Sequence, residues 1–278
     1  MPARLTIITP SLNQGAFIER TIRSVLDQGH PDLEYFVIDG GSTDDSVDII
    51  RRYEDRLAWW VSEPDEGQTD ALNKGLARAT GEVIAYINSD DYYLPGAFEK
   101  ALATLAGDDA LWMAGAARFV GPGDEFIAAW RPQLPVGGRH AWIIGPWGVP
   151  QAATFWRREA FDRYGRFRRD MHYVFDSEFG LRLAMNGHLP ATLPDELAVR
   201  VIHEDAKSWD RSPFFREQRR FYELYRADLN RRERLMYRAT RTAERAGLFK
   251  ATLATRRRLA GLGIPALREQ PEWRDTRS

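Results

Sequence analysis

Val83-Ile84-Ala85-Tyr86-Ile87-Asn88-Ser89-Asp90-Asp91 is an apolar run that ends abruptly in an amide, a hydroxyl and two carboxylates. A short run rich in β-branched and aromatic residues is typical of a strand that is covered on both faces. Ligands of open α/β sheets bind beyond the carboxyl ends of such strands, where Asp90 and Asp91 would lie. Adjacent carboxylates repel each other, and a divalent cation that also holds a phosphate would relieve this. A turn is the simpler alternative, because Pro95-Gly96 follows.

Three strand-helix units precede this stretch. Strand-like segments are followed each time by apolar residues at helical spacing, which gives strands at 5–9, 33–38 and 57–61 and helices at 17–26, 47–53 and 71–79. This alternation predicts a parallel sheet with right-handed crossovers. Ser42-Thr43-Asp44-Asp45 has the spacing of a cap for the second helix.

The strand ends collect carboxylates at one edge of this predicted sheet. Asp39, Asp65, Asp90 and Asp91 each lie at or just after a strand end. Four carboxylates along one edge are hard to explain as independent turns, so we expect a ligand site there. The sequence has neither a Gly-x-Gly-x-x-Gly loop after the first strand nor a Gly-Lys-Ser/Thr phosphate loop, which argues against the usual dinucleotide and P-loop sites.

Composition limits the class of protein. The 278 residues, 44% of them hydrophobic, suit one large α/β domain with an extension. The absence of cysteine excludes disulfides and thiolate metal sites. Residues 1–206 carry 20 Lys+Arg against 31 Asp+Glu, whereas residues 207–278 carry 19 against 9. The basic tail therefore predicts an anionic partner or surface. With neither a signal-peptide pattern nor a membrane-spanning apolar run, we expect a cytoplasmic protein.

Four motifs in order resemble those of family-2 glycosyltransferases. They are Thr9-Pro10-Ser11-Leu12-Asn13, Ile38-Asp39-Gly40-Gly41-Ser42-Thr43-Asp44, Asp70-Ala71-Leu72-Asn73-Lys74-Gly75 and Asn88-Ser89-Asp90-Asp91. The resemblance covers roughly residues 4–205. It implies an α/β fold of the glycosyltransferase-A type, with a Rossmann-like, mostly parallel sheet. Residues 1–95 would form the nucleotide-binding half and 96–206 the acceptor half, followed by a basic helical extension at 207–278.

The resemblance also implies which residues meet the donor. These are Thr9, Pro10, Asn13, Asp39, Asp70, Lys74, Asn88, Ser89 and Asp90, with Asp39 accepting from the base. Asp91 and His203 would hold Mg²⁺ or Mn²⁺ on the diphosphate, and Asn88 stands where many relatives have an acid.

From the residues alone, each of these assignments has a simpler alternative. Asp39 could cap its own strand end. Asp70 and Lys74, at i and i+4 on a helix, could form a surface ion pair. His203 could be an ordinary polar residue at the end of a strand.

Residues 96–206 are expected to face the acceptor. The pattern there predicts a helix at 98–105 and strands at 111–120, 126–130 and 197–202. Tryptophan faces are natural platforms for sugar C–H groups, although core packing is the alternative for each one. The tryptophans concerned are Trp130, Trp142, Trp147 and Trp156. We take Trp147 and, from the resemblance, Gln151 as acceptor contacts.

A candidate general base follows at the start of another predicted helix. Phe175, Phe179 and Leu183 recur at i, i+4 and i+8, which turns them inward and leaves Asp176 in the opening turn. The segment resembles a Glu-Asp element of the same family in which the Asp is the base. Phe175 stands where Glu is usual, so Glu178 is a rival. A helix-start acid that interacts with the macrodipole is the structural alternative.

The tail contains two basic amphipathic segments. Residues 214–236 predict one helix, with apolar positions at Phe214, Phe221, Tyr222, Tyr225, Leu229 and Met236. This stripe could simply pack on the catalytic domain. For residues 245–262 we favour an anionic membrane surface, where a lipid-linked acceptor would lie. No base-reading motif accompanies the charge, which argues against nucleic acid.

Together these features predict an inverting, metal-dependent glycosyltransferase of polysaccharide or cell-envelope synthesis. Its donor would be a nucleoside-diphosphate sugar, with UDP-sugar as the first expectation, and its acceptor a hydroxyl of a glycan or lipid-linked glycan. Inversion rests on the resemblance alone. A non-catalytic nucleotide-sugar or polysaccharide-binding protein on the same fold is the alternative. A nucleotidyltransferase is a weaker one, because Pro10-Ser11-Leu12-Asn13-Gln14 is not a glycine-rich, Arg-containing loop.

Overall fold

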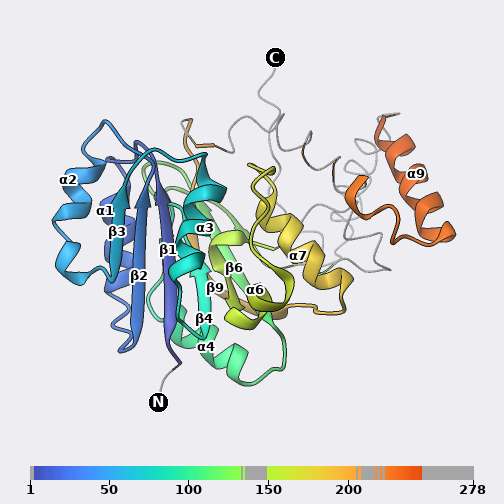
Figure 1. Ribbon diagram of the computed structural model, residues 1–278, viewed down its shortest axis with the longest axis horizontal. Coiled ribbons are helices and arrows are strands. Elements are labelled where there is room, and N and C mark those ends of the chain that lie inside the picture. Colours follow the sequence, from blue (N-terminus) through green and yellow to red (C-terminus); the bar gives the residue numbers. More distant parts are fainter. Residues whose placement is uncertain are drawn as a thin grey trace.

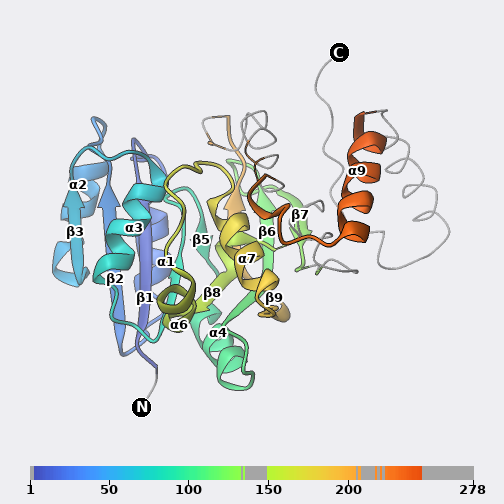
Figure 2. The same ribbon diagram turned by 45° about the vertical axis from the view of Figure 1, so that its right-hand side comes forward.

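The computed structural model describes residues 3–132, 134, 149–204, 206–207, 217, 220 and 223–245. Within these residues a nine-stranded sheet carries helices on both faces (Figures 1 and 2). The strand order is β3-β2-β1-β4-β8-β6-β9-β5, and β7 pairs with β6 outside this path. The predicted α/β architecture with a mostly parallel sheet is confirmed: six strands run in one direction and three in the other.

The first half of the sheet is parallel, as the strand-helix alternation predicts. Its strands are β1 (Leu5–Ser11), β2 (Leu33–Asp39), β3 (Trp59–Ser62) and β4 (Val83–Tyr86). The connecting helices are α1 (Ile18–Leu26), α2 (Ser46–Arg51) and α3 (Gln68–Arg78). Ser11 lies opposite Asp39, and Asp39 opposite Ser62, so these strand ends meet at one edge.

Alternate residues of each central strand enter two different cores. In β4, Val83 and Ala85 pack with residues of α1, whereas Ile84 and Tyr86 pack with residues of α3. A strand buried on both faces needs apolar residues at every position, which explains the continuous run in β4. Gly75 lets α3 approach β1 closely, because a Cβ there would lie 2.8 Å from Cγ2 of Ile8.

The second half of the sheet is mixed. β8 (Thr154–Arg157) runs antiparallel between β4 and β6 (Trp112–Val120). β9 (Ala191–Val201) lies parallel to β6, and the short β5 (Tyr92–Tyr93) forms the edge. β7 (Phe126–Trp130) is the expected return strand. The helices are α4 (Ala97–Ala106), α6 (Arg158–Tyr164) and α7 (Phe175–Met185), and short 3-10 turns occur at Glu54–Arg56 and Gln151–Ala153.

The predicted cap of the second helix is wrong. The residue before α2 is Asp45, and it makes no side-chain capping bond. Ser42 instead donates its hydroxyl and its backbone N–H to the carboxylate of Asp39. Ser42 therefore bonds to the Asp39 carboxylate at the end of β2 and does not cap α2.

The predicted helix over 214–236 is also wrong, because a turn interrupts it at residues 226–230. A separate helix, α9 (Arg231–Arg245), begins with a reciprocal capping box: Asn230 Oδ1 accepts from Glu233 N at 2.9 Å, and Glu233 Oε2 accepts from Asn230 N at 2.9 Å. Packing on the catalytic domain is confirmed for two residues of the stripe, since Tyr225 and Leu229 join the core next to α7. Figures 1 and 2 show α9 beyond α7, away from β1–β3.

Residues 245–262, which we assigned to a membrane surface, lie outside the described residues except for Arg245. Among the helices that the structure does describe, none is both long and apolar enough to span a bilayer.

Candidate functional site

Asp39 is fully buried at the end of β2, and donors of the same chain surround its carboxylate. It accepts hydrogen bonds from Gly41 N at 3.1 Å, Ser42 N at 2.9 Å, Ser42 Oγ at 2.5 Å and Ser62 Oγ at 2.7 Å. These bonds join the loop after β2 to the end of β3. This geometry matches the alternative in which Asp39 caps its own strand end. A nucleobase would compete with these donors for hydrogen bonds to the carboxylate.

The loop after β1 is tied to the loop after β2 through Asn13. Asn13 adopts a positive φ of 52°, donates its N–H to Ser42 Oγ at 2.7 Å, and accepts from Thr43 N at 2.9 Å. Thr9, in contrast, does not reach the sheet edge. β1 continues to Ser11, so Thr9 is fully buried inside the strand and its hydroxyl bonds to Tyr35 at 3.0 Å. Neighbouring Pro10 is buried as well, so neither side chain is exposed at this edge.

Asp90 and His203 meet at the sheet edge. The loop after β4 and the end of β9 place His203 Nε2 3.1 Å from Asp90 Oδ2. The Asp90 side chain is 17% exposed and that of His203 is 6% exposed. Phe17 stacks on the imidazole with ring centroids 4.5 Å apart, which fixes its plane. A cavity of about 140 Å³ reaches both Asp90 and Asp91 beside this pair.

Asp91 has a different environment from Asp90, although the two are adjacent. It is 2% exposed, and its Oδ1 accepts the backbone N–H of Val201 at 3.1 Å. Its own carbonyl and that of buried Ser89 both accept from Thr21 Oγ1 of α1, at 2.6 and 2.9 Å. Burial raises the pKa of Asp91, and the adjacent Asp90 raises it further. Asp91 therefore fastens the loop to β9, and Asp90, not Asp91, is the carboxylate beside His203.

The Asp90–His203 pair suits a divalent cation that arrives with its substrate. Carboxylate oxygen and imidazole nitrogen are accepted ligands of Mn²⁺, and Mg²⁺ is typically held by one or two carboxylates plus substrate phosphates. Within the described residues, no group of three or more His, Asp or Glu side chains forms a larger metal cage. Two protein donors at the edge therefore fit a metal that is completed by a diphosphate. His203 Nδ1 is buried and has no hydrogen-bond partner in the described part of the chain.

Three neutral amides and one lysine form a hydrogen-bonded chain along the same edge. Lys207 Nζ donates to Gln68 Oε1 at 3.0 Å, and Gln68 Nε2 donates to Asn88 Oδ1 at 2.7 Å. Asn88 Nδ2 reaches Gln151 Oε1 at 3.4 Å, and Gln151 Nε2 donates to the Tyr86 carbonyl at 2.9 Å. Asn88, which stands where relatives have an acid, thus has amide partners. The acceptor candidate Gln151 lies directly beside the donor candidate Asn88, and Gln68 and Lys207 carry no signal in the sequence.

Asp176 and Glu178, the two candidates for the base, lie in contrasting surroundings. Asp176 is half-buried in the first turn of α7, and its Oδ1 accepts from Ser177 N at 2.7 Å. Glu178 is 1% exposed. Its oxygens accept from Arg182 Nε at 3.1 Å, from Arg182 Nη2, and from Tyr225 OH at 2.5 Å. Glu178 is therefore bonded within the core, which argues against it as a base and leaves Asp176.

Arg200, near the end of β9, is a charge that the sequence analysis did not single out. Burial raises the pKa of Asp176, and the Ser177 N–H and the Arg200 charge act against this. Arg200 also lowers the pKa of Asp91. In the sequence, Arg200 stands out only as a charged residue between Val199 and Val201, which are both buried in the strand.

Asp70 and Lys74 form ion pairs instead of pointing jointly at the edge. Lys74 Nζ lies 2.8 Å from Glu63 and 3.6 Å from Asp70, and Arg169 also pairs with Asp70. The i, i+4 ion pair of the alternative interpretation is present, but it is not a surface pair, because the Asp70 side chain is only 8% exposed.

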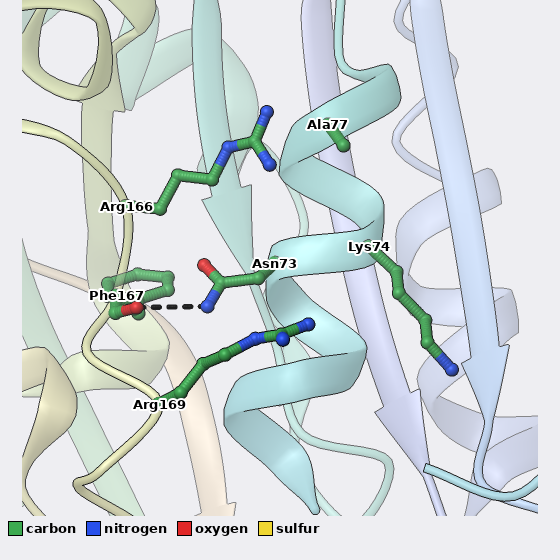
Figure 3. A pocket seen from close by; sticks show the side chains of 6 residues that line it. All are labelled: Asn73, Lys74, Ala77, Arg166, Phe167 and Arg169. Carbon is green, nitrogen blue, oxygen red and sulfur yellow. Dashed lines mark hydrogen bonds between the residues drawn. The ribbon is translucent and has the colours of Figure 1, made fainter. Parts of the chain in front are cut away.

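Lys74 and Arg169 border a cavity of about 530 Å³ between α3 and the segment after α6. Figure 3 shows it lined by Asn73, Lys74, Ala77, Arg166, Phe167 and Arg169. The Asn73 amide donates to the Phe167 carbonyl at 2.9 Å (Figure 3), which ties α3 to this segment.

The tryptophan candidates divide into two groups. Trp156 is 2% exposed and packs against Tyr86, Phe161 and Phe167, so core packing is confirmed for it. Trp130 packs on Phe119 with ring centroids 5.7 Å apart. Trp142 and Trp147 lie outside the described residues.

Comparison with known proteins gives consistent matches. A family model described as glycosyl transferase family 2 matches residues 6–174. An uncharacterized glycosyltransferase of Mycobacterium tuberculosis (strain CDC 1551 / Oshkosh) is 33% identical over 186 residues, which are 65% of this chain and 69% of that protein.

Two solved structures share the fold at lower identity. S. aureus TarS 1-349 in complex with UDP-GlcNAc is 18% identical with a TM-score of 0.63, over 82% of this chain and 68% of that one. The mannosyltransferase PcManGT from Pyrobaculum calidifontis, in complex with GDP-Man and Mn²⁺, is 21% identical with a TM-score of 0.61, over 96% and 83%.

Proposed function

Because the chain belongs to glycosyltransferase family 2, we propose that it transfers a sugar, with inversion, from a nucleoside-diphosphate donor to a hydroxyl group of a glycan or lipid-linked acceptor. One observation carries this proposal. Asp90 pairs with His203 at the edge of the sheet, whereas Asp176, from a separate helix, accepts only from the adjacent Ser177 among the described residues. The candidate metal ligands and the candidate base thus lie on different elements, which suits a reaction in which a metal holds the leaving group and a base activates the acceptor hydroxyl.

Asp90 and His203 are the residues that would hold Mg²⁺ or Mn²⁺. When bound, the metal neutralises the charge of the departing nucleoside diphosphate. Asp91 keeps Asp90 in place through the Val201 N–H, because the loop is then fastened to β9. Gln68 and Asn88 present amide groups at the same edge, where they suit the hydroxyls of the donor.

Asp176 acts as the general base. Its Oδ1 is held by the Ser177 N–H, which leaves Oδ2 to take the proton of the attacking acceptor hydroxyl. Such proton transfer contributes about 10² to 10⁴ in rate. Gln151 bonds to Asn88 and to the Tyr86 carbonyl, and it suits a contact with the acceptor.

The donor is tested most simply by ligand-dependent thermal stability. TarS and PcManGT were solved with UDP-GlcNAc and GDP-Man, so both uridine and guanosine donors belong in the panel. A ligand that binds only the native state raises the unfolding temperature by mass action. We expect one sugar nucleotide to raise it more with Mn²⁺ than without. If none of the panel raises it under either condition, the proposal is wrong.

Turnover should depend on pH through Asp176. The base acts only when deprotonated, and burial raises its pKa above the usual value of about 3.9. Turnover is therefore expected to rise with pH through that raised pKa, so that its acidic limb lies above the usual range of an aspartate. A pH profile of kcat at saturating donor and metal checks this. A profile that stays flat down to the usual aspartate range would argue against Asp176.

The basic segment at 245–262 supports peripheral binding to an anionic membrane at the cytoplasmic face. Each Lys or Arg near such a surface contributes on the order of 1 kcal/mol, and the segment holds Arg245, Lys250, Arg256, Arg257 and Arg258. We expect the protein to sediment with anionic but not neutral liposomes, and to lose this binding at high salt. Salt-insensitive binding to both lipids would exclude an electrostatic anchor.

A further inference from the structure

We propose that Glu217 is a positioning residue for the transfer reaction: its carboxylate holds the backbone that leads into α7 and so sets the place of Asp176. The inference rests on the proposed function, because it takes Asp176 as the general base. Glu217 comes from the basic extension, 41 positions after the aspartate that it would position. It extends the proposed function by making part of the extension necessary for catalysis.

The contacts of Glu217 carry the proposal. Its two oxygens accept from His172 N at 2.9 and 3.0 Å, from Tyr173 N at 2.7 Å and from Val174 N at 3.2 Å. Successive backbone N–H groups that converge on one point form an anion-binding concavity. Here the anion is a side chain of the same chain, placed where the helix macrodipole also favours negative charge.

This carboxylate supplies only part of a helix cap, because Val174 is the one residue of the three that belongs to the start of α7. Val174 is the residue before α7, and its side chain makes no capping bond. The first N–H groups of a helix have no partner within the helix and need one from elsewhere. Glu217 satisfies the N–H groups of the three residues immediately before α7, so a distant segment fixes the direction in which the helix begins.

Other residues of the extension hold the same stretch of backbone. Arg220 donates to the carbonyl of Asp170 at 2.8 Å and to its Oδ2 at 3.0 Å. Lys207 donates to the His172 carbonyl, and Tyr225 OH donates to Glu178 Oε1 within α7.

α3 holds the opposite side of this stretch. Thr69 donates its hydroxyl to the Met171 carbonyl at 2.8 Å, and Asn73 donates to the Phe167 carbonyl at 2.9 Å. Residues 167–174 are thus clamped between α3 and the extension. Hydrogen bonds from two elements therefore hold the segment that leads to the base.

The position of Asp176 follows from this clamp. Asp176 lies two residues after Val174, and its carboxylate bonds to the N–H of Ser177, so it moves with the first turn of α7. Without Glu217, three N–H groups lose their acceptor and the start of the helix can shift. A displacement of about 1 Å at a reacting group can cost about 10² in rate.

Glu217→Ala is expected to lower kcat by at least about tenfold and to leave KM for the donor within about twofold, because Glu217 bonds to none of the residues proposed to hold the donor. Glu217→Gln keeps one acceptor oxygen and is expected to retain most of the activity. Glu223→Ala is the matched control, since Glu223 belongs to the same extension but, among the described residues, pairs only with exposed Arg226 at 3.4 Å. Its kcat should equal that of the wild type.

Hydrogen exchange of the folded protein tests the contact itself. The amides of His172, Tyr173 and Val174 should exchange faster in Glu217→Ala than in the wild type or in Glu223→Ala. Unchanged exchange at these amides, unchanged kcat, or an equal loss in Glu223→Ala would overturn the inference. A protein in which Asp176→Asn loses turnover and Glu217→Ala does not would overturn the inference alone. If the wild type turns over no sugar nucleotide, the proposed function fails first, and the positioning inference fails with it even if the contact is present.

Discussion

Asp176→Asn is expected to lower kcat by at least about 10² while the donor binds nearly as in the wild type. The amide has the shape of the carboxylate and can still accept from the Ser177 N–H, so the local structure should persist. It cannot take a proton from the acceptor hydroxyl. Steady-state kinetics with saturating metal, together with donor affinity from thermal shifts, separates the loss of proton transfer from a loss of binding.

Glu178→Gln is the matched control for this variant. Glu178 is buried with Arg182 and Tyr225, and removal of its charge leaves the arginine without its anionic partner in a poorly solvated site. Breaking such a pair costs about 3 kcal/mol or more in the free energy of unfolding. We therefore expect a loss of stability in urea unfolding with kcat largely retained. If Glu178→Gln instead loses turnover at normal stability, Glu178 is the base.

Asp90→Asn is expected to abolish most of the metal dependence of donor binding and turnover. Asp90 is the carboxylate that contacts His203, and an amide is a much weaker ligand of Mn²⁺ or Mg²⁺. Loss even of groups that only support a metal ligand costs about 10- to 100-fold in metal affinity, so loss of a ligand should cost at least about 10²-fold. The apparent affinity for Mn²⁺, measured by titrating turnover at fixed donor, checks this.

Asp91→Asn is the control for Asp90→Asn. The buried Asp91 accepts from the Val201 N–H, and the amide oxygen of asparagine can accept the same bond. We therefore expect a smaller loss of metal affinity than for Asp90→Asn. The resemblance to the family predicts the reverse order, with the last acid as the principal ligand. A larger loss in Asp91→Asn would support that assignment over the geometry.

The sequence predicts the fold well where local pattern and burial agree. In β4 the unbroken apolar run indicates a strand that is covered on both faces. The polar residues that follow it indicate the edge of the sheet. The place of Asp176 in the first turn of α7 is predicted in the same way, because the spacing of the buried residues of α7 fixes where the helix lies in the sequence.

The remaining features depend on contacts that no local pattern contains. Asp90 and Asp91 are neighbours of the same type, and they differ because Val201, 110 residues after Asp91, supplies an N–H to Asp91, whereas His203 contacts Asp90. Thr9 was misplaced because β1 runs two residues further than its apolar residues indicate. Glu217 looks like any acid in a charged helix until His172–Val174 are seen to converge on it. The capping box at Asn230 and Glu233 could have been found, but the longer apolar stripe masked it.

Release of nucleoside diphosphate from a sugar nucleotide, with and without Mn²⁺, is the most direct test of the proposed chemistry. The donor should be the sugar nucleotide with the largest thermal shift, and wild type and Asp176→Asn should be compared at equal donor occupancy. We expect Mn²⁺-dependent release by the wild type and a rate at least about 10²-fold lower in the variant. A wild-type protein that binds the donor but releases no nucleoside diphosphate would be a binding protein on this fold. Equal release by both proteins would contradict the role of Asp176.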